Sequence, residues 1–151
     1  MKLSHVDEEG RAVMVDISQK PKVRREAIAC GKVYLKEETI RLIRESLIKK
    51  GDVLLVAKVA AISGAKRTSD LIPLCHNIEI EKVDVDFTVM DNAVEIRSYA
   101  LCTDKTGIEM EALTAVTIAA LTIYDMCKAV DRSITITDIR LLQKTKREVS
   151  Q

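Results

Sequence analysis

The sequence predicts an α+β domain, a ferredoxin-like sandwich in which helices pack on one face of a mainly antiparallel sheet. Three observations predict this fold. Two helical patterns follow one another in the first half of the chain, a long alternating segment with a central turn occupies residues 78–103, and a long apolar helical pattern follows it. At 151 residues the chain is long enough for one domain, residues 1–151, whose core needs neither disulfide nor metal.

The first half of the chain begins with extended segments. The polar residues 1–11 predict a flexible N-terminus, residues 13–17 a short strand, and residues 26–35 a second extended segment. Apolar residues at 3.6-residue spacing then predict a helix over 36–50, which Gly51 ends. Asp52 is suited to cap a second, mostly apolar helix from 53 to about 65.

The second half predicts a hairpin, a helix and a final strand. Residues 78–90 and 93–103 alternate apolar with polar side chains, and Asp91 and Asn92 between them are typical of a turn. A helix is expected from about 109 to 130, then a strand over 133–142 and a flexible polar tail over 143–151.

Composition excludes several classes of function. The net charge of +1, the absence of Trp and the single Phe argue against a nucleic-acid partner, because base-stacking surfaces need aromatic rings. No apolar run reaches membrane-spanning length and residues 1–10 lack a signal-peptide core, so we expect no membrane partner and a cytoplasmic location. The four cysteines contain no C-x-x-C pair, which predicts reduced thiols and no metal site.

Three segments carry side chains suited to chemistry. Residues 66–76 combine a basic pair with Cys75 and His76 in a loop, where function concentrates. Glu109 and Glu111 open the long helix, either to balance its dipole or to hydrogen-bond a guanidine-like or pterin edge. Asp125 and Lys128 share a face of the same helix, either as a surface ion pair or as a proton-transfer pair in which an apolar setting lowers the lysine pKa.

The helix sets a geometric constraint on these segments. Glu111 and Asp125 are 14 positions apart, which corresponds to roughly 21 Å along a continuous helix. One small ligand cannot easily contact both ends. Three explanations remain: the ends serve different purposes, the segment at Glu109 and Glu111 is not yet helical, or a symmetric oligomer brings a second chain's end close. We favour a site at a subunit interface.

Six short sequence motifs, which follow one another in order along the chain, closely resemble those of one family. This is the molybdenum-cofactor biosynthesis protein C family of cyclic pyranopterin monophosphate synthases. The resemblance runs from about Leu3 to Leu142, nearly the whole chain. The strings are MVDIS (14–18), KGDV (50–53), AKRT (65–68), LIPLCH (71–76), TGIEMEALT (106–114) and ALTIYDMCKAV (120–130).

The resemblance implies a lyase that converts 3′,8-cyclo-7,8-dihydro-GTP to cyclic pyranopterin monophosphate and pyrophosphate. It also implies a homo-oligomer, a hexamer built as a trimer of dimers with sites at the dimer interfaces, and no required cofactor, with Mg²⁺ an option beside the triphosphate. By motif, the catalytic residues are Asp125, Lys128 and Lys50. The substrate-binding residues that it implies are Leu74, Cys75, His76, Met110, Glu111, Glu109, Lys66 and Arg25.

One position departs from the family pattern, and a competing function stays open. Asn77 stands where Pro is expected after the Cys-His pair, but it removes none of the chemical groups named above. The alternative is a non-catalytic ligand-binding or regulatory module, because the fold alone does not determine function. That alternative predicts that Lys50 and Lys128 are ordinary surface lysines.

Overall fold

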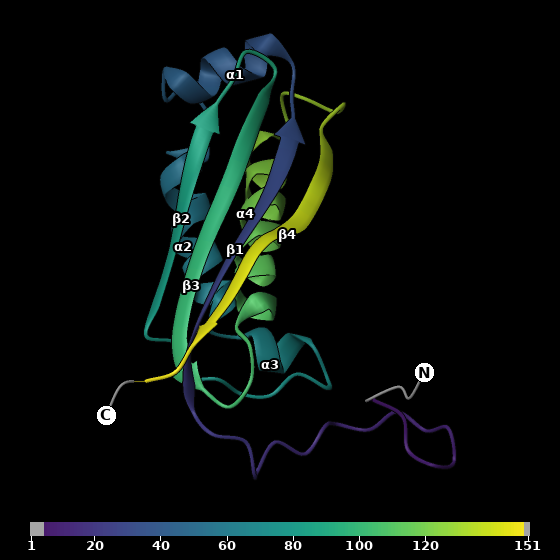
Figure 1. Cartoon of the computed structure of the whole chain (residues 1–151). Helices are drawn as coiled ribbons and strands as arrows, with labels where there is room; N and C mark the ends of the chain where they lie inside the picture. The colour runs from purple at the N-terminus through teal and green to yellow at the C-terminus, as the bar shows by residue number, and fades with distance from the viewer. Residues whose placement is uncertain (1–4, 150–151) are drawn as a thin grey trace.

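A four-stranded antiparallel sheet forms one layer of the molecule, and helices cover one of its faces (Figure 1). The computed structural model describes residues 5–149. The strands are β1 (Val23–Tyr34), β2 (Lys82–Val89), β3 (Ala93–Asp104) and β4 (Thr135–Arg147), in the spatial order β2-β3-β1-β4. The helices are α1 (Glu37–Arg44), α2 (Val53–Ala65), α3 (Thr68–Leu71) and α4 (Glu109–Cys127).

This strand order is that of a split βαβ unit, so the predicted α+β fold is confirmed. The α2 and α4 helices lie side by side behind the sheet in Figure 1, with α1 beyond one end of the strands and α3 at the other. The central strand β1 pairs with β3 along its whole length, from Val23 opposite Asp104 to Tyr34 opposite Ala93. The α4 helix packs along this sheet, so its two ends lie near opposite ends of the strands.

The core is aliphatic, and small residues bring its helices close together. Ala57, Ala61 and Ala65 of α2 are fully buried, and a Cβ at Gly64 would come within 2.7 Å of Ile118 on α4. By length and composition α4 could cross a membrane, but half of its apolar window is buried between the sheet and α2. It is therefore the core helix of the domain.

The predicted helix over 36–50 is wrong in its last third. The α1 helix ends at Arg44, and Ser46 adopts a left-handed conformation with φ 55°. This turn redirects the chain so that Ile48 is buried, whereas Leu47 is 58% exposed. Gly51 has φ 108°, and Asp52 caps α2 by accepting from the Leu55 N–H at 3.0 Å, as predicted.

Several other boundaries differ from the prediction, and β1, for example, begins at Val23 rather than at 26. Residues 13–17 form no strand, and β2 begins at Lys82 rather than at 78. Residues 143–147, predicted as polar tail, belong to β4, which pairs with β1 as far as Arg147 opposite Arg24. The ends of the two predicted flexible termini, residues 1–4 and 150–151, lie outside the described residues.

Candidate active site

An aspartate held between two lysines lies at the C-terminal end of α4. Lys50 Nζ is 2.8 Å from Asp125 Oδ2, and Lys128 Nζ is 2.7 Å from Asp125 Oδ1. Lys50 also donates to the Asp125 backbone carbonyl at 2.9 Å. The structure therefore brings together the three residues predicted to be catalytic.

Local structure explains why these three side chains meet. Asp125 and Lys128 are three positions apart and share a face of α4, and Lys128 is the residue that caps the helix, where the dipole favours a cation. Lys50 reaches them because the chain turns at Ser46 and Gly51 before α2 begins. All three side chains are about half exposed, so a ligand can reach them.

The electrostatics of this triad correct one expectation. The two ammonium groups lower the pKa of Asp125 to about 2, mainly through the hydrogen bond from Lys128 and then the one from Lys50. The same carboxylate raises the pKa of Lys128, chiefly through the hydrogen bond between them. The apolar setting expected to lower that pKa is overridden, because Lys128 lies on the exposed face of α4 rather than among the apolar side chains.

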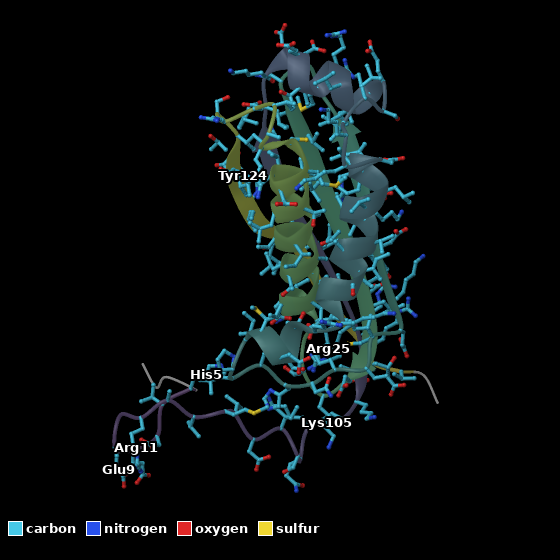
Figure 2. The ribbon with its side chains drawn as sticks, turned by 180° about the vertical axis from the view of Figure 1, so that it is seen from behind. His5, Glu9, Arg11, Arg25, Lys105 and Tyr124 are labelled. Carbon is cyan, nitrogen blue, oxygen red and sulfur yellow. The ribbon has the colours of Figure 1, made fainter. Side chains whose placement is uncertain are left out.

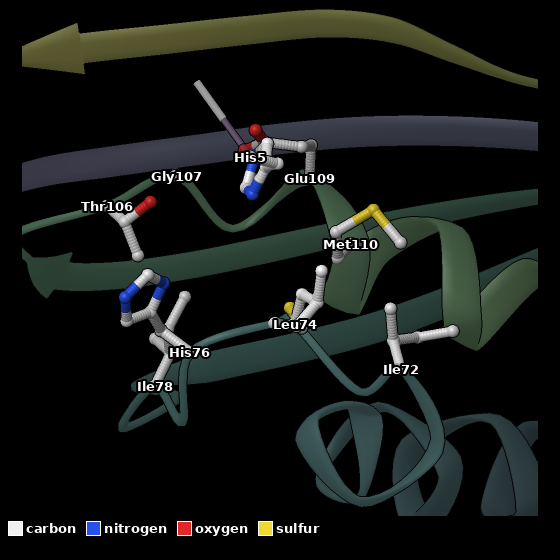
Figure 3. A pocket seen from close by; sticks show the side chains of 10 residues that line it. His5, Ile72, Leu74, His76, Ile78, Thr106, Gly107, Glu109 and Met110 are labelled. Atoms are coloured by element: carbon white, nitrogen blue, oxygen red, sulfur yellow. The ribbon is translucent and has the colours of Figure 1, made fainter. Parts of the chain in front are cut away.

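A cavity of about 350 Å³ lies at the other end of α4 (Figure 3). Its walls come from the loop before β2, the β3–α4 loop, the first turn of α4 and the N-terminal segment. The lining residues are His5, Ile72, Leu74, Cys75, His76, Ile78, Thr106, Gly107, Glu109 and Met110. Five of the residues predicted to bind substrate are among them: Leu74, Cys75, His76, Glu109 and Met110.

Two carboxyl groups near the start of α4 have oxygens without partners, one on Glu109 in the cavity wall and one on the buried Glu111. Within the described part of the chain, Oε2 of Glu109 and Oε2 of Glu111 are buried and accept no hydrogen bond. Burial raises the pKa of Glu111 to about 7, and the charge of Glu109 adds to the effect. The other oxygen of Glu109 pairs with Lys144 Nζ at 2.7 Å. Buried acceptors without donors favour a ligand that brings N–H or O–H groups.

Gly107 makes room for one of these carboxyl groups. A Cβ placed on Gly107 would lie 2.9 Å from the Glu109 carboxyl carbon and closer still to Oε2. Any side chain at position 107 would therefore displace the carboxyl group from its place beside the cavity. The glycine belongs to the site because of this close approach.

His76 and Cys75 differ in what they offer to a ligand. His76 Nε2 lies 2.6 Å from the Val15 carbonyl oxygen. A carbonyl only accepts, so Nε2 carries the proton and, in the neutral ring, Nδ1 is left as an acceptor. Burial raises the pKa of the Cys75 thiol, with Glu111 and Glu109 adding to it, so Cys75 serves as a wall of the cavity rather than as a nucleophile.

Three residues predicted to bind substrate, Arg25, Lys66 and Glu111, are not part of the cavity wall. The Arg25 guanidinium donates to the carbonyls of Asp104 and Lys105 at 3.0 and 3.1 Å, which fixes the start of the β3–α4 loop. Lys66 is an exposed residue at the C-terminus of α2. In this chain Arg25 supports the loop that carries Thr106 and Gly107.

The two clusters are well separated within one chain. The α4 helix is continuous from Glu109 to Cys127, so the roughly 21 Å between Glu111 and Asp125 is a real separation. Figure 2 shows it: Tyr124, next to Asp125, lies near one end of the molecule, and His5, Arg25 and Lys105 lie at the other. Of the three explanations for this spacing, a non-helical segment at Glu109 and Glu111 is excluded.

Sequence reasoning missed six residues of the site, of which Ile72 and Ile78 are apolar wall residues. Thr106 and Gly107 lie in segment 106–114, which resembles the family, but only the structure shows that Gly107 closely approaches the Glu109 carboxyl group. The sequence predicts Lys144 in the polar tail, yet the strand register of β4 brings it to Glu109. His5 was assigned to a flexible N-terminus. Among the described residues, no group of three or more His, Cys, Asp or Glu is arranged to hold a metal ion.

A comparison with family models gives one match that covers most of the chain. The model of the MoaC family matches residues 14–147, which include Lys50, Asp125, Lys128 and all the cavity-lining residues except His5. The chain belongs to the MoaC family.

Several curated MoaC-type relatives cover nearly the whole chain. The cyclic pyranopterin monophosphate synthase of Thermoanaerobacter pseudethanolicus is 53% identical over 147 residues, which is 96% of this chain and 93% of the relative. The synthase of Heliobacterium modesticaldum is 56% identical, over 95% of this chain and 91% of the relative. The synthase of Peptoclostridium acidaminophilum is 55% identical, over 96% and 92%. The predicted assignment to these lyases of molybdenum cofactor biosynthesis is confirmed.

Proposed function

We propose that the chain converts 3′,8-cyclo-7,8-dihydro-GTP to cyclic pyranopterin monophosphate with release of pyrophosphate. The observation that carries this proposal is the pair of buried, unpartnered carboxyl oxygens on Glu109, which lines the cavity, and on Glu111, two positions further along α4. The ring of a guanine derivative presents adjacent N–H donors on one edge, and two carboxyl groups are complementary to such an edge. Ile72, Leu74, Ile78 and Met110 give the cavity the apolar walls that a flat ring requires.

The Glu111 carboxyl group is suited to this recognition because its pKa of about 7 is poised between two states. Ligand N–H donors stabilise the ionised form, so binding at neutral pH removes a proton from Glu111. A buried acceptor left unpaired costs free energy, so a ring without the donors is rejected. This supports selection of a guanine-type edge.

The triad of Lys50, Asp125 and Lys128 is suited to the chemical steps. Opening the purine ring and closing a pyrazine ring requires repeated proton transfers, and attack of a sugar hydroxyl on the α-phosphorus builds negative charge there. With its raised pKa, Lys128 is an ammonium group in the free chain, able to donate a proton and to neutralise phosphate charge. Asp125 holds both ammonium groups in position.

We further propose that the active unit is a homo-oligomer, a hexamer built as a trimer of dimers, with each site at a dimer interface. The separation of the two clusters along α4 supports this arrangement, because one small substrate cannot contact both ends within one chain. Exposed apolar side chains on α2 and α4, namely Leu55, Val59 and Leu121, support subunit contact at this surface.

The remaining proposals concern location, metal and other partners. We propose a cytoplasmic enzyme without nucleic-acid or membrane partners, which the four free cysteines and the near-zero net charge support. Mg²⁺ is proposed only as a companion of the substrate triphosphate, not as a resident cofactor.

The test is product formation from enzymatically made 3′,8-cyclo-7,8-dihydro-GTP. The wild type is expected to release pyrophosphate and cyclic pyranopterin monophosphate, and folded Lys50→Met and Lys128→Met variants are expected to release neither. Absence of turnover by a folded wild-type oligomer would contradict the proposal. It would favour the non-catalytic ligand-binding module in its place.

A further inference from the structure

The N-terminal segment supplies a wall of the cavity that the function proposed above does not use. His5 lines the cavity together with residues more than sixty positions further along the chain. Figure 3 shows its imidazole beside Gly107 and Glu109, whereas His76 approaches the cavity from the loop before β2. The two histidines, the only ones in the chain, thus lie at one cavity and come from two different segments.

A small hairpin over residues 5–13 presents His5. Val6 and Ala12 form an antiparallel bridge, and the Val13 N–H donates to the His5 carbonyl at 3.0 Å. The backbone of His5 is therefore paired, which limits the directions that its side chain can take. We call residues 5–13 the N-terminal hairpin.

Asp7 closes the turn of the N-terminal hairpin. Its Oδ1 accepts from the N–H groups of Glu9 and Arg11 at 3.0 and 2.8 Å, and its Oδ2 pairs with Arg11 Nε at 3.0 Å. Gly10 supplies the left-handed residue of the turn, with φ 79°. Asp7 is not among the residues that line the cavity, so it acts on the cavity only through the hairpin.

Two hydrogen bonds attach the segment that follows the hairpin to the domain. The Val15 carbonyl accepts from His76 and the Ser18 carbonyl accepts from Lys105 Nζ, at 2.6 and 2.8 Å. His76 belongs to the cavity, and Lys105 directly precedes Thr106 in its wall. The attachment points are thus part of the site itself, which keeps the hairpin at the mouth of the cavity.

We propose that His5 contacts the substrate and contributes to its specificity, and that Asp7 is the positioning residue that presents His5. This inference rests on the proposed function. The His5 imidazole offers one hydrogen-bonding edge on the side of the cavity where Glu109 lies. It complements the carboxyl pair by contacting a second polar atom of the same cyclised GTP derivative.

Steady-state kinetics with 3′,8-cyclo-7,8-dihydro-GTP test the proposal. His5→Ala is expected to raise KM about tenfold and to change kcat less than about threefold, as loss of one hydrogen bond to bound substrate requires. His5→Gln, which keeps a hydrogen-bonding side chain, is expected to recover part of the loss. Asp7→Ala is expected to raise KM about threefold but to add nothing in the His5→Ala background. Glu8→Ala, at an exposed position of the same turn, is the matched control.

A second measurement does not depend on turnover. Because the chain has two histidines, comparing the NMR spectrum of His5→Ala with that of the wild type assigns the imidazole resonances of both. On addition of substrate to the Lys128→Met variant, both resonances are expected to shift. A His5 resonance that stays unchanged while that of His76 shifts, or an unaltered KM in active His5→Ala, overturns the role of His5 and leaves the proposed function intact. Absence of wild-type turnover together with two unmoved resonances overturns both.

Discussion

Lys50 and Asp125, 75 positions apart in the chain, are joined by two hydrogen bonds from one ammonium group. Lys50 Nζ donates to the Asp125 carboxylate at 2.8 Å and to the carbonyl of the same residue at 2.9 Å. Because Lys128 holds the other carboxylate oxygen, Asp125 orders two cations at the end of α4. In this geometry Asp125 holds both ammonium groups in position and raises the pKa of Lys128.

Replacement of Asp125 by Asn is expected to separate these roles. The amide keeps the size of the side chain but removes the charge, so the pKa of Lys128 is expected to fall from its raised value and activity to fall by about 100-fold or more. Turnover assays and NMR titration of labelled lysines measure the two effects. Asp91→Asn, at an exposed ion pair with Arg44, is the control. Activity within about tenfold of the wild type would contradict the assigned role.

Glu111 is expected to make stability depend on pH. Its pKa is raised from 4.5 to about 7, so the folded protein binds more protons than the unfolded chain between those values. The contribution is fully present below pH 4.5 and is lost as pH rises through about 7, a change on the order of 3 kcal/mol. Denaturant unfolding at several pH values is expected to show this loss in the wild type but not in Glu111→Gln. Parallel curves for the two proteins would contradict the raised pKa.

The Gly107→Ala variant is expected to fold but to bind substrate poorly. The added methyl group meets the end of the flexible Glu109 side chain rather than backbone, so the carboxyl group is displaced while the fold is kept. We expect KM to rise about tenfold and the free energy of unfolding to change by less than about 1 kcal/mol. Gly64→Ala is the informative contrast, because there the methyl group meets Ile118 in the core and stability is expected to fall. A wild-type KM in Gly107→Ala would show that the Glu109 carboxyl group is not needed at this place.

Asp131 is expected to be a stability residue. It is buried after α4 and accepts from Lys36 N at 2.8 Å, Thr39 Oγ1 at 3.1 Å and Ser133 N at 2.8 Å, which joins the start of α1 to the start of β4. Asp131→Ala leaves these donors unsatisfied and is expected to lower the free energy of unfolding by about 3 kcal/mol. Denaturant unfolding measures it, with exposed Asp91→Ala as the control. A loss below about 1 kcal/mol would mean that water replaces the carboxylate.

Mixing of two inactive variants tests whether the site is shared between subunits. Lys128→Met and Glu111→Gln each remove one functional group, at opposite ends of α4. If each site combines the two ends from different subunits, a mixed dimer has one site that lacks both groups and one site that is intact. After co-refolding in equal amounts, activity is expected to return to about a quarter of the wild type, because half of the dimers are mixed and each has one working site of two. Mixtures as inactive as the separate variants would place both ends of the site within one chain.

The fold was largely predictable because its buried elements carry local patterns. The β2–β3 hairpin alternates with period two, and α2 begins at a residue, Asp52, whose side chain can cap it. Two of the boundary errors arise where no local pattern marks the end of the element. Residues 143–147 of β4 form an exposed edge strand held by backbone pairing with β1, and such a strand leaves no apolar alternation to read. The end of α1 depends on the conformation of Ser46, which no periodicity encodes.

The candidate site was predictable in part for similar reasons. The three-residue spacing of Asp125 and Lys128 places them on one helix face, and the resemblance to the family assigned them a role. By itself, then, the sequence determined the α+β fold class, most of the strands and helices, and the family, and it singled out the two ends of α4 as candidate sites. The tertiary structure alone decided that Lys50 joins Asp125, that Lys144 and Gly107 shape the surroundings of Glu109, and that His5 reaches the cavity. These contacts join residues distant in sequence, and their geometry follows from packing of the whole domain rather than from any local pattern.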